Sequence, residues 1–382
     1  MNKTGLDHLL REAAAKGRVA GVVALAADRN GPIYEAAFGE RVRGGGVAMT
    51  LDTVFHIASM TKAITAAAAM QLVEQGKISL DEPLGRLLPY LDQPPVLEGF
   101  EAAGQPRLRP ARAPVTLRQL LTHTAGFAYD IWNADLNRYL KASGLPGARS
   151  GRLKGLEQPL AFEPGTRWEY GIGIDWAGRV VEAVSGQDLN SYVLDHILRP
   201  LGMKDASYVP DDAQAGRGAG LHVRHPDGTL SGQDFRKPSF PEFFPGGAGL
   251  VSTGPDYLRF LQALLAGGGG VLRPETVAMM LQNQMGALDV LPLRTAEPGL
   301  SHDFEFFPGQ PKKWGLSFLI NTKAVPGRRG AGSAGWAGLF NCYYWLDPGA
   351  GVAGVMLTQS LPFADPVLLD LFGRFEAGVY AA

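Results

Sequence analysis

A serine and a lysine that can act together as nucleophile and base stand three positions apart, at Ser59 and Lys62. Residues at i and i+3 share one face of a helix, with Cβ atoms about 5–6 Å apart, so the hydroxyl and the amine can touch. A helix N-terminus and burial both favour the neutral amine, which can accept a proton. A serine beside such an amine is an activated nucleophile.

The helix predicted to hold this pair is apolar on every side. Between Ala63 and Val73 only Thr65 and Gln71 are polar, and a helix of this kind is expected to be buried all round. Gly76 is the predicted C-terminal stop.

Tyr170 is a candidate third member of the site. It follows a Glu-Pro-Gly turn at 163–165 and precedes a predicted helix. A phenol with an ordinary pKa near 10 needs a neighbouring cation to act as a base near neutrality, and Lys62 could be that cation. From the residues alone, a packing role for Tyr170 stays open.

A later segment, 335–339, can bring backbone to the site. Glycines flank Trp336, and they permit a close approach of the backbone to a ligand. An edge-strand N–H there could face the nucleophile. From the residues alone, Trp336 can also be a core aromatic.

Composition limits the class of protein. The chain has 382 residues, enough for one large domain or two smaller ones, with 46% hydrophobic and 19% charged residues. A net charge of −1 gives no electrostatic reason for nucleic acid or an anionic membrane. The single Cys342 excludes an internal disulfide. The amphipathic N-terminus lacks a signal-peptide core, so we expect a cytoplasmic protein, a monomer or small homo-oligomer, with no membrane partner.

The pattern predicts an α+β fold. Strands are expected at 22–27, 33–38, 53–57, 315–321, 339–346 and 351–358, with a weaker one at 221–223. Helices are expected at 1–17, 115–121, 131–140, 174–184, 189–198, 257–265 and 364–380. Thr116 and Gln119 form a predicted capping box. An antiparallel sheet built from both chain ends (1–80 plus 246–382) would carry a mostly helical inserted domain, 81–245, with the site in the cleft between them.

Several motifs together resemble one known superfamily. Its landmarks match, in order, at 59–62 (Ser-x-x-Lys), 120–126, 163–166, Tyr170, 200–203 and 249–253. The chain is therefore similar to the serine β-lactamase and penicillin-binding protein superfamily, which implies a β-lactamase-like fold with helices flanking the sheet.

Two departures favour the family VIII carboxylesterases over class C β-lactamases. Ile172 stands where class C enzymes carry the asparagine of Tyr-x-Asn, and Trp336 stands where they carry the lysine of Lys-Thr-Gly. The missing hydrogen bonds are worth about 1–3 kcal/mol each. Apolar side chains at these positions suit the acyl or alcohol group of an ester.

The resemblance implies a serine carboxylesterase for short-chain acyl esters. Ser59 would carry the acyl group, Lys62 and Tyr170 would act as one acid–base unit, and the N–H groups of Ser59 and Leu339 would form the oxyanion hole. We expect no metal and no organic cofactor. The residues expected to contact substrate are Trp336, Gly338, Ile172, Phe127 and Tyr129. Further aromatics can be pocket or core: Trp132, Phe243, Phe244, Phe304, Phe306 and Phe307.

Three different functions remain possible on these residues. An acyltransferase would use the same acyl-enzyme with an alcohol or amine acceptor. A β-lactamase or D-amino-acid peptidase would differ in substrate, and a binding domain would keep only the fold.

Other residues of reactive type are weaker candidates for a functional site. Ser333 lies in a motif that lacks the first glycine of a nucleophile elbow. His222 and His225 lack further metal ligands nearby and are expected to be surface residues. His123 is expected to be structural.

Overall fold

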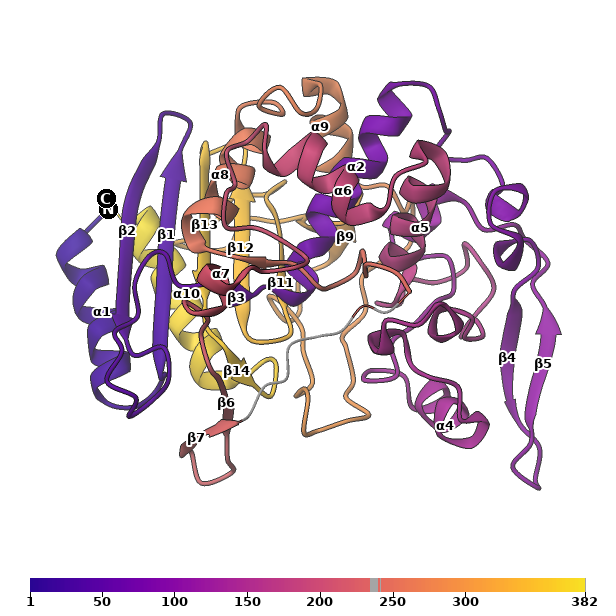
Figure 1. Ribbon diagram of the computed structural model, residues 1–382, viewed down its shortest axis with the longest axis horizontal. Coiled ribbons are helices and arrows are strands. Elements are labelled where there is room, and N and C mark those ends of the chain that lie inside the picture. The colour runs from indigo at the N-terminus through magenta and orange to yellow at the C-terminus, as the bar shows by residue number, and fades with distance from the viewer. Residues whose placement is uncertain (234–239, 241, 382) are drawn as a thin grey trace.

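One antiparallel sheet of seven strands joins the two ends of the chain, as predicted (Figure 1). The computed structural model describes residues 1–233, 240 and 242–381. The strands run in the order β2-β1-β13-β12-β11-β10-β9. Their bounds are β1 Gly21–Asp28, β2 Pro32–Gly39, β9 Lys312–Trp314, β10 Leu319–Asn321, β11 Ala334–Gly338, β12 Cys342–Asp347 and β13 Val352–Leu357.

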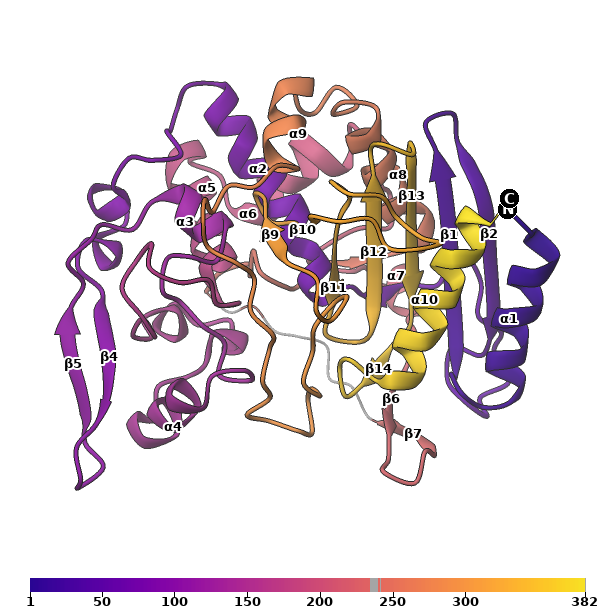
Figure 2. The ribbon, with the colours of Figure 1, turned by 180° about the vertical axis from the view of Figure 1, so that it is seen from behind.

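Helices cover both faces of this sheet. Figure 1 has α8 in front of the strands, whereas Figure 2, seen from behind, has α1 and α10 in front. Cover on both faces explains why β1 and β12 are buried along almost their whole length rather than at alternate positions. The bounds are α1 Lys3–Ala15, α8 Gly254–Leu265 and α10 Pro366–Tyr380.

The apolar helix predicted from the sequence is α2, Thr61–Glu74, and it is buried from Thr61 through Leu72. It packs along α5, Gly173–Ser185, on the side away from the sheet. Gly76 ends it with a positive φ of 67°, in the left-handed region that favours glycine. The predicted burial and the predicted stop are both confirmed.

The middle of the chain, predicted to be mostly helical, consists of short helices and two hairpins joined by long loops. The predicted capping box at Thr116 is present, with its side chain and that of Gln119 each accepting a backbone N–H. The remaining helices are α3 Leu117–Leu121, α4 Ala134–Ser143, α6 Leu189–Val193, α7 Asp212–Ala215 and α9 Pro274–Met280. No described helix is long and apolar enough to span a bilayer.

Smaller sheets tie the middle to the ends. The strand β6, Leu221–Arg224, pairs with β7, Leu230–Gln233, and runs parallel to β14, Ser360–Leu361. Part of the predicted insertion is thus hydrogen-bonded to the C-terminal part of the chain. Two more pairs are β3 Phe55–His56 with β8 Val251–Ser252, and β4 Pro95–Phe100 with β5 Pro106–Pro110.

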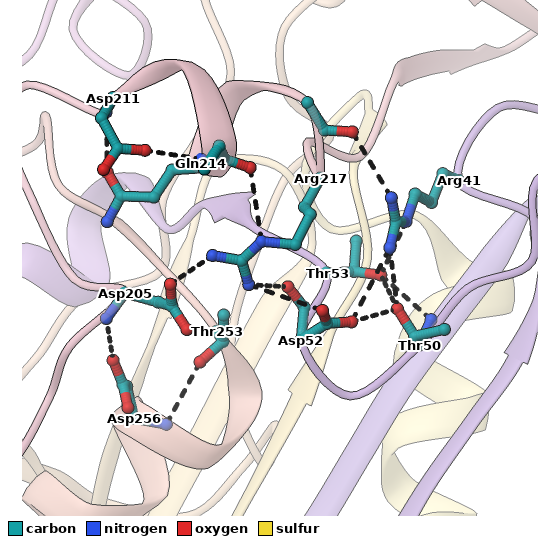
Figure 3. A network of polar contacts seen from close by, with 12 residues as sticks. Arg41, Thr50, Asp52, Thr53, Asp205, Asp211, Gln214, Arg217, Thr253 and Asp256 are labelled. Carbon is teal, nitrogen blue, oxygen red and sulfur yellow. Dashed lines mark hydrogen bonds and ion pairs between the residues drawn. The ribbon is translucent and has the colours of Figure 1, made fainter.

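A polar network holds the segment that leads into β3. The Arg217 side chain donates to the backbone carbonyl of Asp52 at 2.7 Å and pairs with Asp205 (Figure 3). The Asp205 N–H donates in turn to Asp256, near the start of α8. These contacts fix the approach of the chain to Ser59.

Several predicted boundaries were wrong. The predicted strand 339–346 is the end of a hairpin, because the chain turns after Gly338, with Asn341 at φ 58°, and returns as β12. Of the predicted strand 315–321 only residues 319–321 form a strand, β10, because residues 315–318 are the turn that follows β9. The helix predicted over 189–198 changes to a π-helical turn after Val193. Neither the β4–β5 hairpin nor α9 was predicted.

The weaker strand predicted at 221–223 is confirmed as β6, and the unpredicted α7 and β7 lie on either side of it in the chain. Residues 234–239 and 241 lie outside the described residues, as does residue 382 of the predicted sheet domain.

A buried ion pair anchors α10 and gives the first prediction. The Arg329 guanidinium donates two hydrogen bonds to the Glu376 carboxylate, at 2.7 and 3.0 Å, and both side chains are at most 2% exposed. Arg329→Met leaves the carboxylate buried and unpaired, which should lower the free energy of unfolding by about 3–5 kcal/mol. Denaturant unfolding measures this cost.

The double variant Arg329→Met/Glu376→Leu serves as the control, because it removes both charges. It should recover most of the lost stability. Equal stability of the single and double variants would contradict a stabilising role for the pairing.

Candidate active site

Ser59 lies on a short 3₁₀ turn, Ala58–Met60, between β3 and α2. Ala58 precedes it with φ 45°, a left-handed conformation that is uncommon for a residue with a Cβ. The Tyr257 hydroxyl donates to the carbonyl of Met60 at 3.0 Å and holds the turn from below. Ser59 itself is only half-buried, so its hydroxyl can reach a substrate.

Lys62 places its amine against that hydroxyl. Its Nζ lies 3.0 Å from Ser59 Oγ and 3.0 Å from the Tyr129 hydroxyl, and it donates to the carbonyl of Gly247. The side chain is 1% exposed. Burial lowers the pKa of Lys62 to about 7, and the charge of Asp175 opposes this shift. A neutral amine is therefore accessible near neutral pH, as the sequence predicted.

Tyr170 is the second group beside Ser59 and Lys62. The centre of its ring lies 5.0 Å from Lys62 Nζ. Burial raises the pKa of Tyr170, against smaller lowering effects from Ser59 and Trp336. Its buried hydroxyl has no well-aligned hydrogen-bond partner among the described residues. The phenol therefore stays neutral in the free protein.

The third segment reaches the site along β11. A Cβ on Gly338 would stand 2.3 Å from the carbonyl oxygen of Ile57, so the end of β11 lies directly against the turn that carries Ser59. The ring of Trp336, two residues earlier, packs against the Tyr170 ring with its centre 4.9 Å away and tilted by 57°. In the described part of the chain, the N–H groups of Ser59 and Leu339 donate to no protein acceptor.

Aromatic rings form a wall beside these groups. A narrow crevice next to Trp336 is lined by Trp168, Leu293, Phe304 and Phe306. The Trp132 ring also packs against Tyr170, with the ring centres 5.4 Å apart and the planes tilted by 58°. By contrast, Phe243 and Phe244 line a separate open pocket beside α5, and Phe307 lies under Arg329.

Three of the predicted substrate contacts have different roles. Phe127 is 1% exposed and stacks on Trp176, and Ile172 is fully buried at the N-cap of α5, so both pack the core. Tyr129 contacts the Lys62 amine through its hydroxyl. The apolar character of these residues suggested pocket lining, but a sequence does not give the direction in which a side chain points.

The sequence did not reveal two groups behind Lys62. The Asp175 carboxylate is 4% exposed and accepts the N–H of Gly247 at 2.9 Å. Gly247 lies in the glycine-rich run 246–249, a composition that permits a close backbone approach at this place.

The competing sequence features find ordinary partners. Ser333 is fully buried and donates to the carbonyl of Gly330. His222 was expected at the surface but is buried, at 2% exposed, and accepts the N–H of Arg43, whereas His225 is exposed as expected and contacts Ser231. His123 is buried beside Tyr170 with φ 57°, and burial keeps its pKa well below the ordinary value. Nowhere in the described ranges do three or more histidine, cysteine or acidic side chains gather as a metal site would require.

Comparison with known proteins identifies the relatives of this chain. A family model described as Beta-lactamase matches residues 6–378. Monacolin J acid methylbutanoyltransferase of Aspergillus terreus is 34% identical, over 98% of this chain and 95% of its own. Lovastatin esterase of Penicillium rubens is 33% identical, over 98% of each chain. The unliganded structure of simvastatin synthase from Aspergillus terreus has a TM-score of 0.86 and 32% identity, covering 99% and 98% of the two chains.

The close approach of β11 to the nucleophile turn gives the second prediction. Gly338→Ala places a methyl group against the carbonyl of Ile57 and must push β11 outward. A displacement of about 1 Å at a reacting centre can cost on the order of 10²-fold in rate, so kcat/KM for p-nitrophenyl butyrate should fall by that order.

Gly349→Ala is the matched control. It lies in the exposed turn between β12 and β13, where a Cβ meets only one side-chain oxygen at 3.4 Å. This variant should keep its activity. Wild-type kcat/KM in Gly338→Ala would refute the contact.

Proposed function

This chain belongs to the Beta-lactamase family, and we propose that it is a serine acyltransferase that carries an acyl group on Ser59 and passes it to an alcohol, with hydrolysis as the competing outcome. The observation that supports this most is the buried Lys62 amine, 3.0 Å from a half-buried serine hydroxyl. Serine enzymes that form acyl-enzymes need this pairing of nucleophile and base.

In the first half-reaction, Ser59 Oγ attacks the carbonyl carbon of an ester or thioester. Its proton moves to Lys62 Nζ as the new C–O bond forms. The bond to the leaving oxygen or sulfur then breaks, and the leaving group takes the proton from the Lys62 ammonium, which returns the amine to its neutral form. The intermediate ammonium has acceptors ready in the Tyr129 hydroxyl and the Gly247 carbonyl.

In the second half-reaction, an acceptor hydroxyl attacks the acyl-enzyme. Its proton goes to Lys62, the bond to Ser59 Oγ breaks, and the serine recovers a proton. Tyr170, which keeps its phenolic proton, would donate a hydrogen bond to the leaving oxygen in each half-reaction. The N–H groups of Ser59 and Leu339 would hold the oxyanion, a role in which one donor is worth about 3–4 kcal/mol.

Two observations support acyl transfer over hydrolysis: the aromatic side chains near Ser59 and the activities named for similar proteins. The aromatic wall of Trp132, Tyr170 and Trp336 offers an apolar surface to an organic acceptor rather than to water. One relative is named as a methylbutanoyltransferase and another as an esterase, so the same scaffold accompanies both outcomes. We infer a short, branched acyl group and a bulky alcohol acceptor, which revises the carboxylesterase expected from the sequence to an acyltransferase.

A β-lactamase, a D-amino-acid peptidase and a binding domain each have less support. A β-lactam or D-alanyl peptide carries a carboxylate that the class C lysine would bind, and Trp336 occupies that place without a charge. A binding domain without activity would have no use for an amine buried against a serine, because such burial is costly.

The acyl-enzyme gives the third prediction. Ser59→Ala should abolish hydrolysis of p-nitrophenyl acetate and adduct formation with a fluorophosphonate, measured by intact mass. Tyr170→Phe should lower kcat by on the order of 10²–10⁴, the usual share of general acid–base catalysis.

Ser333→Ala is the serine control and should react like the wild type, because Ser333 is buried away from the site. An adduct on Ser59→Ala would show that another residue is the nucleophile.

The partition of the acyl-enzyme gives the fourth prediction. With a p-nitrophenyl 2-methylbutanoate donor and increasing amounts of a bulky alcohol, such as monacolin J acid or cyclohexanol, the new ester should outgrow the free acid. Trp336→Ala opens the aromatic wall and should shift the product ratio toward the acid. Chromatography of both products measures the ratio.

Free acid as the sole product at every acceptor concentration would identify a hydrolase and reject the transferase. Measurements with nitrocefin and a D-alanyl peptide in the same assay test the β-lactamase and peptidase activities.

A further inference from the structure

Asp175 is a buried carboxylate that the proposed reaction does not yet use. It lies in the first turn of α5 and is 4% exposed. Among the described residues it makes no ion pair within 4.0 Å. Buried carboxylates normally have a cation in contact, so the position of this one, behind Lys62 but not touching it, needs an explanation.

Two bridges connect this carboxylate to the Lys62 amine. The Gly247 peptide is the first, because its N–H donates to Asp175 at 2.9 Å while its carbonyl accepts from Lys62. Tyr129 is the second, because its hydroxyl lies 3.0 Å from Lys62 Nζ and close enough to the Asp175 carboxylate to lower the pKa of that carboxylate.

Gly247 is needed for both bridges to close. A Cβ at this position would stand 2.5 Å from a carboxylate oxygen of Asp175 and 2.9 Å from the Tyr129 hydroxyl. The carboxylate and the hydroxyl therefore converge on one side of the same peptide, and only glycine leaves room for them.

The groups that face Lys62 come from several parts of the chain. They are Ser59 on the turn before α2, Tyr129 and Tyr170 on loops, His123 on the turn after α3, and Asp175 on α5. Burial favours the neutral form of the histidine and of both tyrosines. Burial also raises the pKa of Asp175, but the Lys62 charge and the Gly247 N–H oppose this rise, so Asp175 is the group here whose negative charge can stabilise the ammonium.

We propose that Asp175 is a positioning residue that acts through Tyr129 and Gly247 to hold the Lys62 amine and to set the pH at which it can take the Ser59 proton. This inference rests on the proposed function, in which Lys62 is the base. Asp175 keeps its charge throughout and exchanges no proton. It stabilises the ammonium that forms when Ser59 is deprotonated, and it thereby raises the basicity that burial would otherwise remove.

The test is the pH dependence of kcat/KM for p-nitrophenyl acetate, a substrate that does not titrate in the range. In the wild type kcat/KM should rise through an acid limb near pH 7 and then level off, because only the neutral amine accepts a proton. Asp175→Asn keeps the shape and removes the charge. Its acid limb should move to lower pH by about one unit, and its plateau should fall at least tenfold.

A purely structural role would lower the plateau and leave the acid limb in place, and that result would overturn the inference. Glu182→Gln is the matched control, since Glu182 is a second carboxylate on α5 that caps the N–H of Leu189 instead of facing Lys62. Its acid limb should coincide with that of the wild type.

If Asp175→Asn does not fold, Tyr129→Phe tests whether Asp175 acts on Lys62. It breaks one bridge and should move the acid limb in the same direction by a smaller amount, whereas an unmoved limb would reject the inference. Failure of the proposed function looks different, because the wild type itself would then gain no fluorophosphonate adduct on Ser59.

Discussion

The structure depends on keeping one lysine amine out of water. Solvent would favour the ammonium form of Lys62, so a usable base near neutral pH requires cover on every side. A single sheet face cannot supply that cover. The helix α2 therefore lies between the sheet and α5. Because it is covered on both sides, its sequence from 63 to 73 is almost wholly apolar. Because the sheet strands lie at both ends of the chain and helices lie in its middle, the fold surrounds α2.

Contacts between backbones, more than between side chains, bring the distant parts of the site together. Gly338 brings β11 against Ile57, Gly171 brings the Tyr170 loop against the carbonyl of Phe127, and Gly247 closes over Asp175. A Cβ at any of these glycines would stand 2.5 Å or less from a neighbouring heavy atom. Packing this close leaves little room for adjustment, so the reacting groups keep their relative positions without a bound ligand.

The sequence predicted what depends on near neighbours. The Ser59–Lys62 contact and the Thr116 cap follow from residues three positions apart, and the stop at Gly76 follows from the glycine itself. The hairpin between β11 and β12 was missed because both strands are buried, and a continuous apolar run contains no alternation to mark a turn. The groups behind Lys62 were missed for a different reason. Asp175 lies in the first turn of α5 and Gly247 in a loop, and no periodicity links residues that meet only in the folded chain.

Trp336 stands where class C β-lactamases carry a lysine. The absence of that second cation decides how protons move in the proposed reaction. A tyrosinate base would need a positive charge strong enough to overcome burial, which raises the pKa of Tyr170. Lys62 is the cation beside it, and with a pKa of about 7 it either carries that charge or acts as the base, but not both at once. Because an indole gives no second charge, the amine must accept the proton and the phenol must keep its own. The same indole removes the group that would bind a substrate carboxylate, so the assignment of the base and the preference for uncharged acyl donors have one physical origin.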